Sequence, residues 1–311
     1  MELSLKKPAN LKKSRYKKYN NSILHLMLLP GVVFIILFSY IPLMGSVMAF
    51  QNFRPTLGIF GSAWVGLDNF RFVARIPGSF RILWNTVYIA SAKLVLHIIV
   101  ALTFALLLNE LRSKRAKRVV QTFIYMPHFL SWVILSGIFI DILSPSTGAV
   151  NMFLQRLGIE PIFFLGDTFW FPITMIVTDV WKGFGFGTII YLAAITSINP
   201  NLYEAASIDG AGRIKQTIHV TIPGMMPIIM LMAVLSLGNI LNAGFDQIFN
   251  MYSPLVYETG DIIDTFVFRL GIQQQQFAAA TAVGLMRSVV SFFFVSLAYW
   301  IAYRFVGYRI F

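Results

Sequence analysis

The chain has 311 residues, of which 57% are hydrophobic and only 12% are charged, and its mean hydropathy is +0.71. This composition excludes an ordinary soluble globular protein. The formal net charge is +12, and the absence of cysteine excludes disulfides, thiolate metal sites and cysteine catalysis. We therefore expect an all-α, polytopic membrane protein.

Six apolar segments are long enough to cross a bilayer, whose core of about 30 Å needs about 20 helical residues. The first apolar segment follows a basic stretch, 1–22, but it is too long for a secretory signal and lacks a small-residue cleavage site. We interpret it as a retained span, so a single six-span domain, 23–311, follows the basic segment. The predicted spans cover 23–50, 82–108, 119–143, 169–195, 223–242 and 277–303.

The distribution of lysine and arginine predicts the orientation of these spans. With both termini in the cytoplasm, 16 basic residues lie on the inner side and six in outer loops. Seven of the inner residues belong to the N-terminal segment and five form a cluster at 112–118, whereas four arginines at 51–81 act against the trend. This asymmetry follows the positive-inside rule. It indicates a multi-pass protein of the cytoplasmic membrane in contact with lipid, and it explains the net charge without nucleic acid.

The loop between the fourth and fifth spans, 196–222, falls on the inner side and mixes small residues, charge and glycine. Asn199 and Pro200 predict a helix start, because asparagine caps free amide groups and proline suits the first helical position. Gly210 predicts a turn, since glycine tolerates positive φ. Residues 213–219 can form a second short helix. We expect a helix–turn–helix at the membrane surface, although a plain amphipathic connector is the alternative.

The pattern Glu204-Ala205-Ala206, a following glycine and the ending Val220-Thr221-Ile222-Pro223 resembles the EAA loop of permease subunits in binding-protein-dependent ABC importers. The resemblance implies that this loop is a cytoplasmic coupling helix that docks into a groove of a separate ATPase. It also implies the ABC importer permease fold with six transmembrane helices. The residues that the resemblance assigns to ATPase coupling are Glu204, Ala205, Ala206, Asp209, Gly210, Ala211 and Pro223.

The chain contains no phosphate-binding G-x-x-x-x-G-K-[ST] loop of its own. Gly183 and Gly187 lie within the fourth span, where a small-x-x-x-small pair indicates close helix packing. The chain is therefore expected to be a non-catalytic subunit that binds no cofactor, with ATP and Mg²⁺ held by the partner ATPases.

A second patch of resemblance narrows the family. Residues 244–250, 255–258 and 260–265 resemble the external loop of carbohydrate importer permeases of the polysaccharide or complex-oligosaccharide branch, and 179–200 and 282–285 are similar to that branch as well. The likeness covers nearly the whole chain from the first span to the last. It implies a second homologous permease subunit, two cytoplasmic ATPases, and an extracellular substrate-binding protein or lipoprotein. A homodimer is the alternative to the heterodimer.

Sugar recognition calls for planar hydrogen-bonding groups and aromatic faces. Each candidate also has a structural interpretation, since aromatic residues near span ends commonly form interfacial belts. The candidates for the substrate path are Asp179, Trp181, Lys182, Asp246, Gln247, Asn250 and Tyr257.

Charged residues inside the predicted spans also need partners. Asp179 and Lys182 are three residues apart and could pair along one helix, and Lys93 and His97 share a face of the second span. Outside the spans, 261–271 predicts a short amphipathic helix and 273–276 a solvated loop.

Two other function classes fit the sequence less well. An ion-coupled secondary carrier or channel acting alone would need broken helices in matching halves and coupled carboxylates, and we find neither pattern. A membrane-embedded enzyme would need a convergent acid, nucleophile or metal cluster, whereas His25, His97, His128 and His219 are scattered. The residues leave open whether the sugar is acidic or neutral.

Overall fold

The computed structural model describes residues 22–238, 240–301 and 304. Nearly all of the basic segment 1–22 lies outside the described residues, as do 302–303 of the last predicted span and Arg309. The chain falls into two compact units, 1–47 and 48–311, and the predicted single domain, 23–311, is divided between them.

The first unit contains α1 (Ser22–Ile35), a π-helical turn (Ile36–Tyr40) and α2 (Ile41–Leu43), and a 3₁₀ segment (Met44–Phe50) leads into the second unit. The π turn comes directly before the Ile41-Pro42 pair. Proline has no N–H and its ring crowds the carbonyl four residues earlier, so a wider turn lets the helix continue past it. The helical path from Leu24 to Phe50 accordingly stays unbroken over 27 residues.

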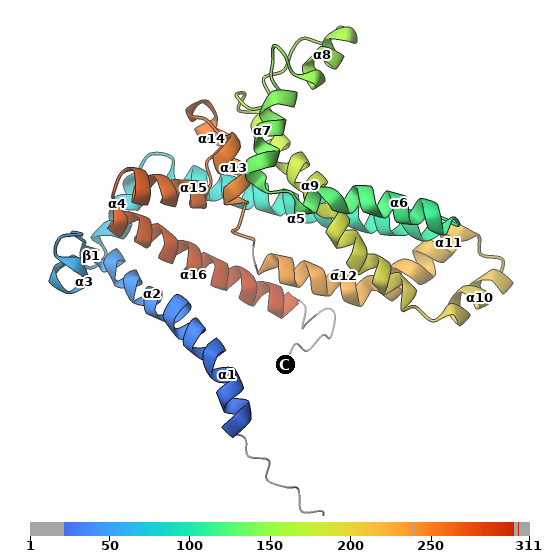
Figure 1. Ribbon diagram of the computed structural model, residues 1–311, viewed down its shortest axis with the longest axis horizontal. Helices are drawn as coiled ribbons and strands as arrows, with labels where there is room; N and C mark the ends of the chain where they lie inside the picture. Colours follow the sequence, from blue (N-terminus) through green and yellow to red (C-terminus); the bar gives the residue numbers. More distant parts are fainter. Residues whose placement is uncertain (1–21, 239, 302–303, 305–311) are drawn as a thin grey trace, which may run out of the picture. The chain divides into compact units, whose positions relative to one another are not determined.

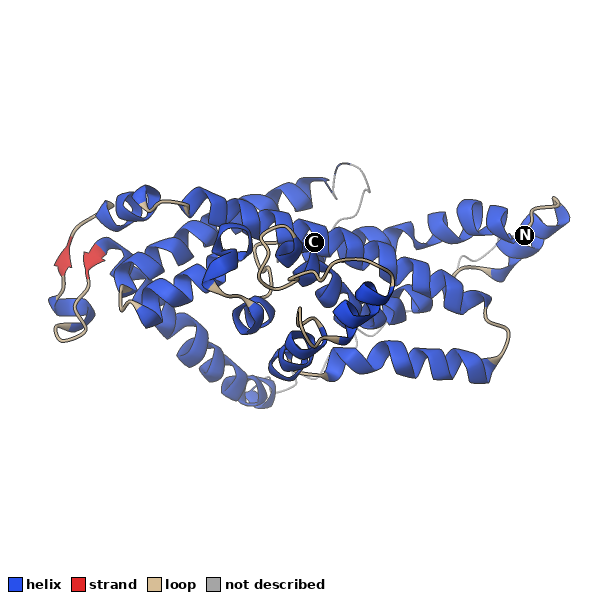
Figure 2. Cartoon of the chain, turned by 90° about the horizontal axis from the view of Figure 1, so that it is seen from above, coloured by secondary structure: helices blue, strands red, loops and turns tan. Residues whose placement is uncertain are grey.

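The second unit is built of helices throughout most of the part that the structure describes, which confirms the all-α class (Figures 1 and 2). Its four long helices are α5 (Ser79–Glu110), α9 (Trp170–Thr196), α12 (Ile222–Leu237) and α16 (Phe277–Ile301). The shorter helices are α3 (Gly58–Gly61), α4 (Asp68–Arg75), α6 (Lys114–Tyr125), α7 (Trp132–Ile142), α8 (Ala149–Arg156), α10 (Pro200–Ile208), α11 (Arg213–Gln216), α13 (Phe245–Met251), α14 (Tyr257–Gly260) and α15 (Ile263–Phe268). Single turns of 3₁₀ or π helix are η3 (Met126–Phe129), η4 (Thr217–Thr221), η5 (Pro254–Val256) and η6 (Arg269–Gln273).

A two-stranded antiparallel sheet joins β1 (Gln51–Asn52) to β2 (Ala63–Trp64), with Gln51 opposite Trp64 and Asn52 opposite Ala63. It closes the short loop that contains α3 (Figure 2).

Five helical stretches within the described residues are long and apolar enough to cross a membrane. They are Leu24–Phe50, Ser79–Glu110, Trp170–Thr196, Arg213–Leu237 and Phe277–Leu297.

The segment 119–143, predicted as one span, is not one helix. The path of the chain bends by 103° between Lys114–Phe129 and Trp132–Ile142, and Figure 1 shows α7 turned away from the direction of α6. Pro127 starts the 3₁₀ turn η3, Leu130 is extended, and the Ser131 hydroxyl caps the next helix by accepting from the amide of Ile134 at 3.4 Å. The segment therefore bends because it contains both a helix stop and a helix start.

The predicted division between a short helix over 213–219 and a new span at Pro223 was also wrong. Helices α11, η4 and α12 form one continuous stretch from Arg213 to Leu237. As at Pro42, a π turn precedes an Ile-Pro pair, and the amide of Ile222 donates to the carbonyl of Thr217. The second half of the loop 196–222 is consequently part of the same helical stretch as the fifth span.

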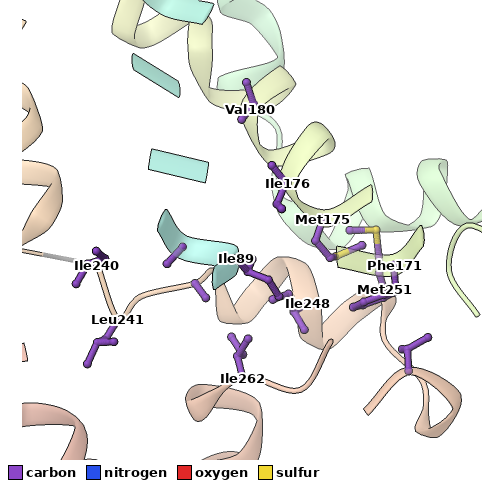
Figure 3. Close-up of a cluster of buried hydrophobic side chains, with 13 residues drawn as sticks. Ile89, Phe171, Met175, Ile176, Val180, Ile240, Leu241, Ile248, Met251 and Ile262 are labelled. Atoms are coloured by element: carbon purple, nitrogen blue, oxygen red, sulfur yellow. The ribbon is translucent and has the colours of Figure 1, made fainter. Parts of the chain in front are cut away.

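The core of the second unit forms around α5 and α9, which pack along each other. A cluster of buried side chains joins α9 to α5 and to α13, with Ile89, Met175 and Ile248 at its centre (Figure 3). A second cluster on the same helix pair includes Ala101 and Phe184.

Close packing of α9 depends on its glycines, as the spacing of Gly183 and Gly187 predicts. A Cβ atom on Gly183 would lie 2.4 Å from the ring of His97, and one on Gly187 would lie 3.0 Å from Cβ of Ala101, both on α5. On the neighbouring face, a Cβ atom on Gly185 would lie 2.0 Å from the carbonyl oxygen of Ile124 in α6.

The substitution Gly185→Ala is therefore expected to destabilise the protein by about 1–3 kcal/mol, because the α6 backbone has to move away from α9. The matched control is Gly137→Ala in α7, where an added Cβ meets nothing within 4 Å. Thermal unfolding of the two purified variants tests this difference. Equal melting temperatures would contradict the packing argument.

Candidate functional site

The segment that resembles the EAA loop forms a helix ended by a Schellman motif. The side chain of Asn199 accepts from the amide of Asn201 at 3.0 Å, and α10 begins at Pro200 as the sequence predicts. At the other end, the amide of Gly210 donates to Ser207 O at 3.1 Å and the amide of Ala211 donates to Ala206 O at 2.8 Å. These are the two hydrogen bonds that define the motif.

Gly210 supplies the left-handed backbone that this motif needs, with φ of +76°. An added Cβ would meet nothing within 4 Å, so the demand for glycine is conformational and does not arise from packing. The predicted turn at Gly210 is thus confirmed. Its effect is to reverse the chain sharply between α10 and α11.

The outer surface of this turn is open. Glu204, Ala205, Asp209 and Gly210 are exposed, and Ala206 and Ala211 are half-buried. Two large apolar side chains beside them are also exposed, Ile208 at 86% and Ile214 at 77%. An exposed apolar patch next to charged groups is typical of a protein-binding surface.

Behind the turn, one side-chain contact joins α10 to α11 and two join them to neighbouring helices. The hydroxyls of Tyr203 and Thr221 lie 3.0 Å apart, which ties α10 to the start of the fifth span. The amide of Gln216 donates to Ser207 Oγ at 2.9 Å, and Arg213 forms an ion pair with Glu110 at the end of α5. These contacts link α10 to α11 and to the start of the fifth span, and they link α11 to α5.

A buried polar junction connects α5, α9 and α13. Lys93 is buried, and its ammonium donates to Ala243 O at 2.7 Å and to Oε1 of Gln247, and lies 3.6 Å from Asp179 Oδ1. His97 lies on the same face of α5, as its spacing predicts, with Nε2 3.1 Å from Asp179 Oδ2. The ammonium of Lys93 therefore has two hydrogen-bond acceptors and one ion-pair partner.

The expected pairing of Asp179 with Lys182 does not form. Asp179 pairs across to α5, and Lys182 donates to the carbonyl oxygen of His128 in η3 at 3.0 Å. Lys182 also lies over the ring of Trp132 at 5.5 Å. The sequence spacing placed both residues on α9, but the neighbouring helices supply their partners.

Gln247, which was predicted to line a substrate path, is a buried residue that links α13 to α9. Its amide nitrogen donates to Met175 O and to Thr178 Oγ1 on α9, both at 2.8 Å, and its side chain is fully buried. It therefore holds α13 against α9 and presents no surface to a ligand in this state.

The other path candidates are spread over three elements. Asp246 is exposed on α13, and its carbonyl oxygen accepts from the amide of Asn250 at 2.6 Å. Trp181 is partly exposed on α9 and packs edge-on against Phe139. Tyr257 is half-buried on α14. The structure does not bring these residues together into one pocket.

A cluster that the sequence reasoning missed surrounds Tyr257. Arg269 lies 4.5 Å above its ring and forms a buried ion pair with Asp261. The ring centroids of Tyr252 and Tyr257 lie 5.1 Å apart with the ring planes tilted, and burial raises the pKa of Tyr252 to about 12, with Tyr257 adding to the shift. The ring of Tyr252 therefore stays neutral at physiological pH.

A further ion pair joins the same region to the last span. Arg287, for which no role was predicted, pairs with Asp264 on α15, and burial raises the pKa of this carboxyl although Arg287 opposes the shift. The predicted amphipathic helix over 261–271 is present as α15 and η6.

The turn between α10 and α11 and this aromatic cluster lie far apart in the second unit. Figure 1 places α10 and α11 at the end opposite to α4 and α15. Several helices long enough to cross a membrane, together with an exposed turn at one end, are the features expected of a multi-pass membrane permease.

Comparison with known proteins gives the family. Residues 97–307 match the binding-protein-dependent transport system inner membrane component. The chain is 40% identical over 282 residues to Protein LplB of Bacillus subtilis, covering 91% of this chain and 89% of that protein. It is also 40% identical over 289 residues to the polygalacturonan/rhamnogalacturonan transport system permease protein YteP of the same organism, covering 93% and 90%. The chain belongs to the family of binding-protein-dependent transport system inner membrane components.

Two solved structures share this fold over nearly the full chain. The first is a bacterial ABC transporter involved in the import of the acidic polysaccharide alginate, with a TM-score of 0.85 and 38% identity, covering 92% of this chain and 96% of that one. The second is the bacterial alginate ABC transporter in complex with an alginate pentasaccharide-bound periplasmic protein, with a TM-score of 0.84 and 37% identity, covering 91% and 95%.

Proposed function

We propose that this chain is one of two permease subunits in an ATP-driven importer of acidic oligosaccharides. The observation that carries the coupling role is the exposed Schellman turn at Gly210, joined through Tyr203 and Arg213 to two long helices. A turn of this kind presents a rigid, projecting surface to an ATPase, since its backbone hydrogen bonds are satisfied internally.

The proposed partners follow from the family and from the missing phosphate-binding loop. They are a second homologous permease, two cytoplasmic ATPases that hold ATP and Mg²⁺, and an extracellular substrate-binding protein or lipoprotein. The chain itself acts as a non-catalytic subunit in the cytoplasmic membrane, with both termini on the inner side.

The substrate class is supported by two independent relatives. YteP carries a name that specifies polygalacturonan and rhamnogalacturonan, and the two solved structures belong to an importer of alginate. The names of these relatives describe polysaccharide transport, and alginate is an acidic polysaccharide. An acidic sugar chain of several units is therefore the substrate class that we propose for this chain.

In the proposed cycle, the ATPases close on ATP and move the coupling segments of both permeases toward each other. The contact of Tyr203 with Thr221 passes this movement to α12, and the pair of Arg213 with Glu110 passes it to α5. Because α5 packs along α9, the two helices move together, so the inner ends of the two permease subunits close together and their outer ends open to receive the sugar. Hydrolysis then returns the inner-open state.

The test is ATP hydrolysis by the complete complex in proteoliposomes with its binding protein. We expect oligouronates to stimulate hydrolysis and uptake, whereas neutral oligosaccharides of equal length and amino acids do not. Stimulation by neutral sugars alone would overturn the acidic class, and stimulation by amino acids would overturn the sugar assignment. Uptake by this chain alone, driven by an ion gradient, would favour the secondary-carrier alternative.

A further inference from the structure

A cavity of about 680 Å³ lies between the turn that joins α4 to α5 and the segment from α14 to η6. This volume is within the range of about 300–1,000 Å³ that is usual for ligand pockets. Apolar side chains such as Ile76, Pro77 and Phe266 line part of it. Its polar lining includes Arg81, Tyr257, Glu258, Arg269, Gln274 and Gln276.

One of the two arginines in this cavity is fixed in place. The side chains of Arg269 and Asp261 are only 16% and 3% exposed, and Asp261 also accepts from the hydroxyl of Thr265 at 2.7 Å. The guanidinium of Arg269 lies over the ring of Tyr257. Such a buried pair keeps its partners, because separating it would leave a charge uncompensated.

The other arginine is held by an exchangeable partner. Arg81 on α5 forms an ion pair with Glu258 on α14, and both side chains are 58% exposed. Ion pairs at this exposure contribute little to stability. A ligand carboxylate can therefore replace Glu258 on Arg81 without disturbing the fold.

We propose that this cavity is an entry subsite for a carboxylate-bearing sugar, whose carboxylate displaces Glu258 from Arg81. The planar guanidinium matches a carboxylate with two parallel hydrogen bonds. The amides of Gln274 and Gln276 and the phenol of Tyr257 suit sugar hydroxyls, and the apolar wall suits the faces of the ring. This inference rests on the proposed function, since it assumes that acidic oligosaccharides reach this end of the protein.

The ion pair of Arg81 with Glu258 also sets the selectivity of the subsite. Glu258 competes for Arg81, so a neutral sugar that cannot replace it gains no ionic contact. The same competition keeps the affinity low, which suits a site that passes the sugar on toward the membrane path. Removal of Arg81 and removal of the Glu258 charge consequently have opposite effects on binding.

The experiment measures trigalacturonate binding to the permease complex in nanodiscs, without binding protein, by isothermal titration calorimetry. We expect Arg81→Gln to weaken binding by about tenfold, the loss of one charge-assisted pair, and Glu258→Gln to strengthen it severalfold. Maltotriose, a neutral trisaccharide, should bind weakly to all variants and show neither change.

The matched controls come from a second exposed ion pair, Arg71 with Asp68 on α4, whose side chains are 69% and 65% exposed and do not line the cavity. Arg71→Gln and Asp68→Gln should leave trigalacturonate binding unchanged. Absence of binding to the unmodified complex, or equal losses in Arg81→Gln and Arg71→Gln, would overturn the proposal.

Uptake assays separate this proposal from the proposed function. If the complete importer transports oligouronates but the cavity variants behave like the unmodified complex, only the subsite is wrong. If no oligouronate is transported at all, the proposed substrate class fails. If the variants change only the affinity for the binding protein, the cavity is a docking surface and the sugar subsite is overturned.

Discussion

Replacing Gly210 with valine is expected to reduce substrate-stimulated ATP hydrolysis and uptake by at least about tenfold. A left-handed backbone costs an ordinary L-residue roughly 1–2 kcal/mol, and a β-branched residue is the least suited to it. The Schellman hydrogen bonds to Ser207 and Ala206 would be lost together with the turn. The turn at Gly210 would then no longer face the ATPase in a fixed orientation. Uptake by the reconstituted complex measures the effect.

Two further variants distinguish the effect of backbone conformation at Gly210 from the effect of side-chain size. Gly212 lies two residues away, is exposed, has φ of −69°, and an added Cβ there meets nothing within 4 Å. Gly212→Val should therefore leave uptake close to that of the unmodified protein. Gly210→Asn should retain most of the activity, because asparagine tolerates the left-handed region better than other side chains. An inactive Gly210→Asn together with an inactive Gly212→Val would argue against the turn as the cause.

Local signals explain why the helix start and the turn in the loop 196–222 could be predicted from the sequence. Asn199, Pro200 and Gly210 each act on their own backbone, so a helix start and a helix stop can be predicted without knowledge of the neighbours. The same reasoning failed at Pro223. A proline is usually found at the start of a helix. Here a π turn over Thr217–Thr221 accommodates Pro223, and the helix continues through it.

Interactions between helices were the part that the sequence could not supply. Spacing places Asp179 and Lys182 on one helix, yet their partners come from α5 and η3, which only the tertiary packing selects. Gln247 appeared to be an external polar residue because its loop follows the fifth span. In the folded chain α13 turns inward against α9, and the glutamine becomes fully buried.

The bend within 114–142 has local signals in the sequence, but the sequence did not predict it. Pro127 and Ser131 are local signals of a helix stop and a helix start, but the continuous apolar character of 119–143 outweighed them in the sequence reading. Hydropathy reports where a segment can lie and says little about its direction.

Replacing Lys93 with methionine is expected to destabilise the protein by about 3–5 kcal/mol, the usual effect of removing one partner from a buried ionic group. The change leaves Ala243 O, Oε1 of Gln247 and the Asp179 carboxylate without the ammonium that now satisfies them. Because these acceptors lie on three different elements, α13 and the segment before it should loosen from the α5–α9 pair. Thermal unfolding of the purified complex and hydrogen exchange in 243–251 measure the two effects.

The control is Lys182→Met on α9, which removes a single hydrogen bond to His128 O and a contact with Trp132, and should cost clearly less. A second test uses the double variant Lys93→Met/Asp179→Asn. If the uncompensated carboxylate is the main cause of the loss, this double variant is more stable than Lys93→Met alone, because the two changes are coupled. His97 still donates to the side chain at position 179 in that variant, so the junction keeps one of its contacts. Strict additivity of the two changes would show that Lys93 acts through the backbone of 243 and through Gln247, and that the charge pair with Asp179 contributes little.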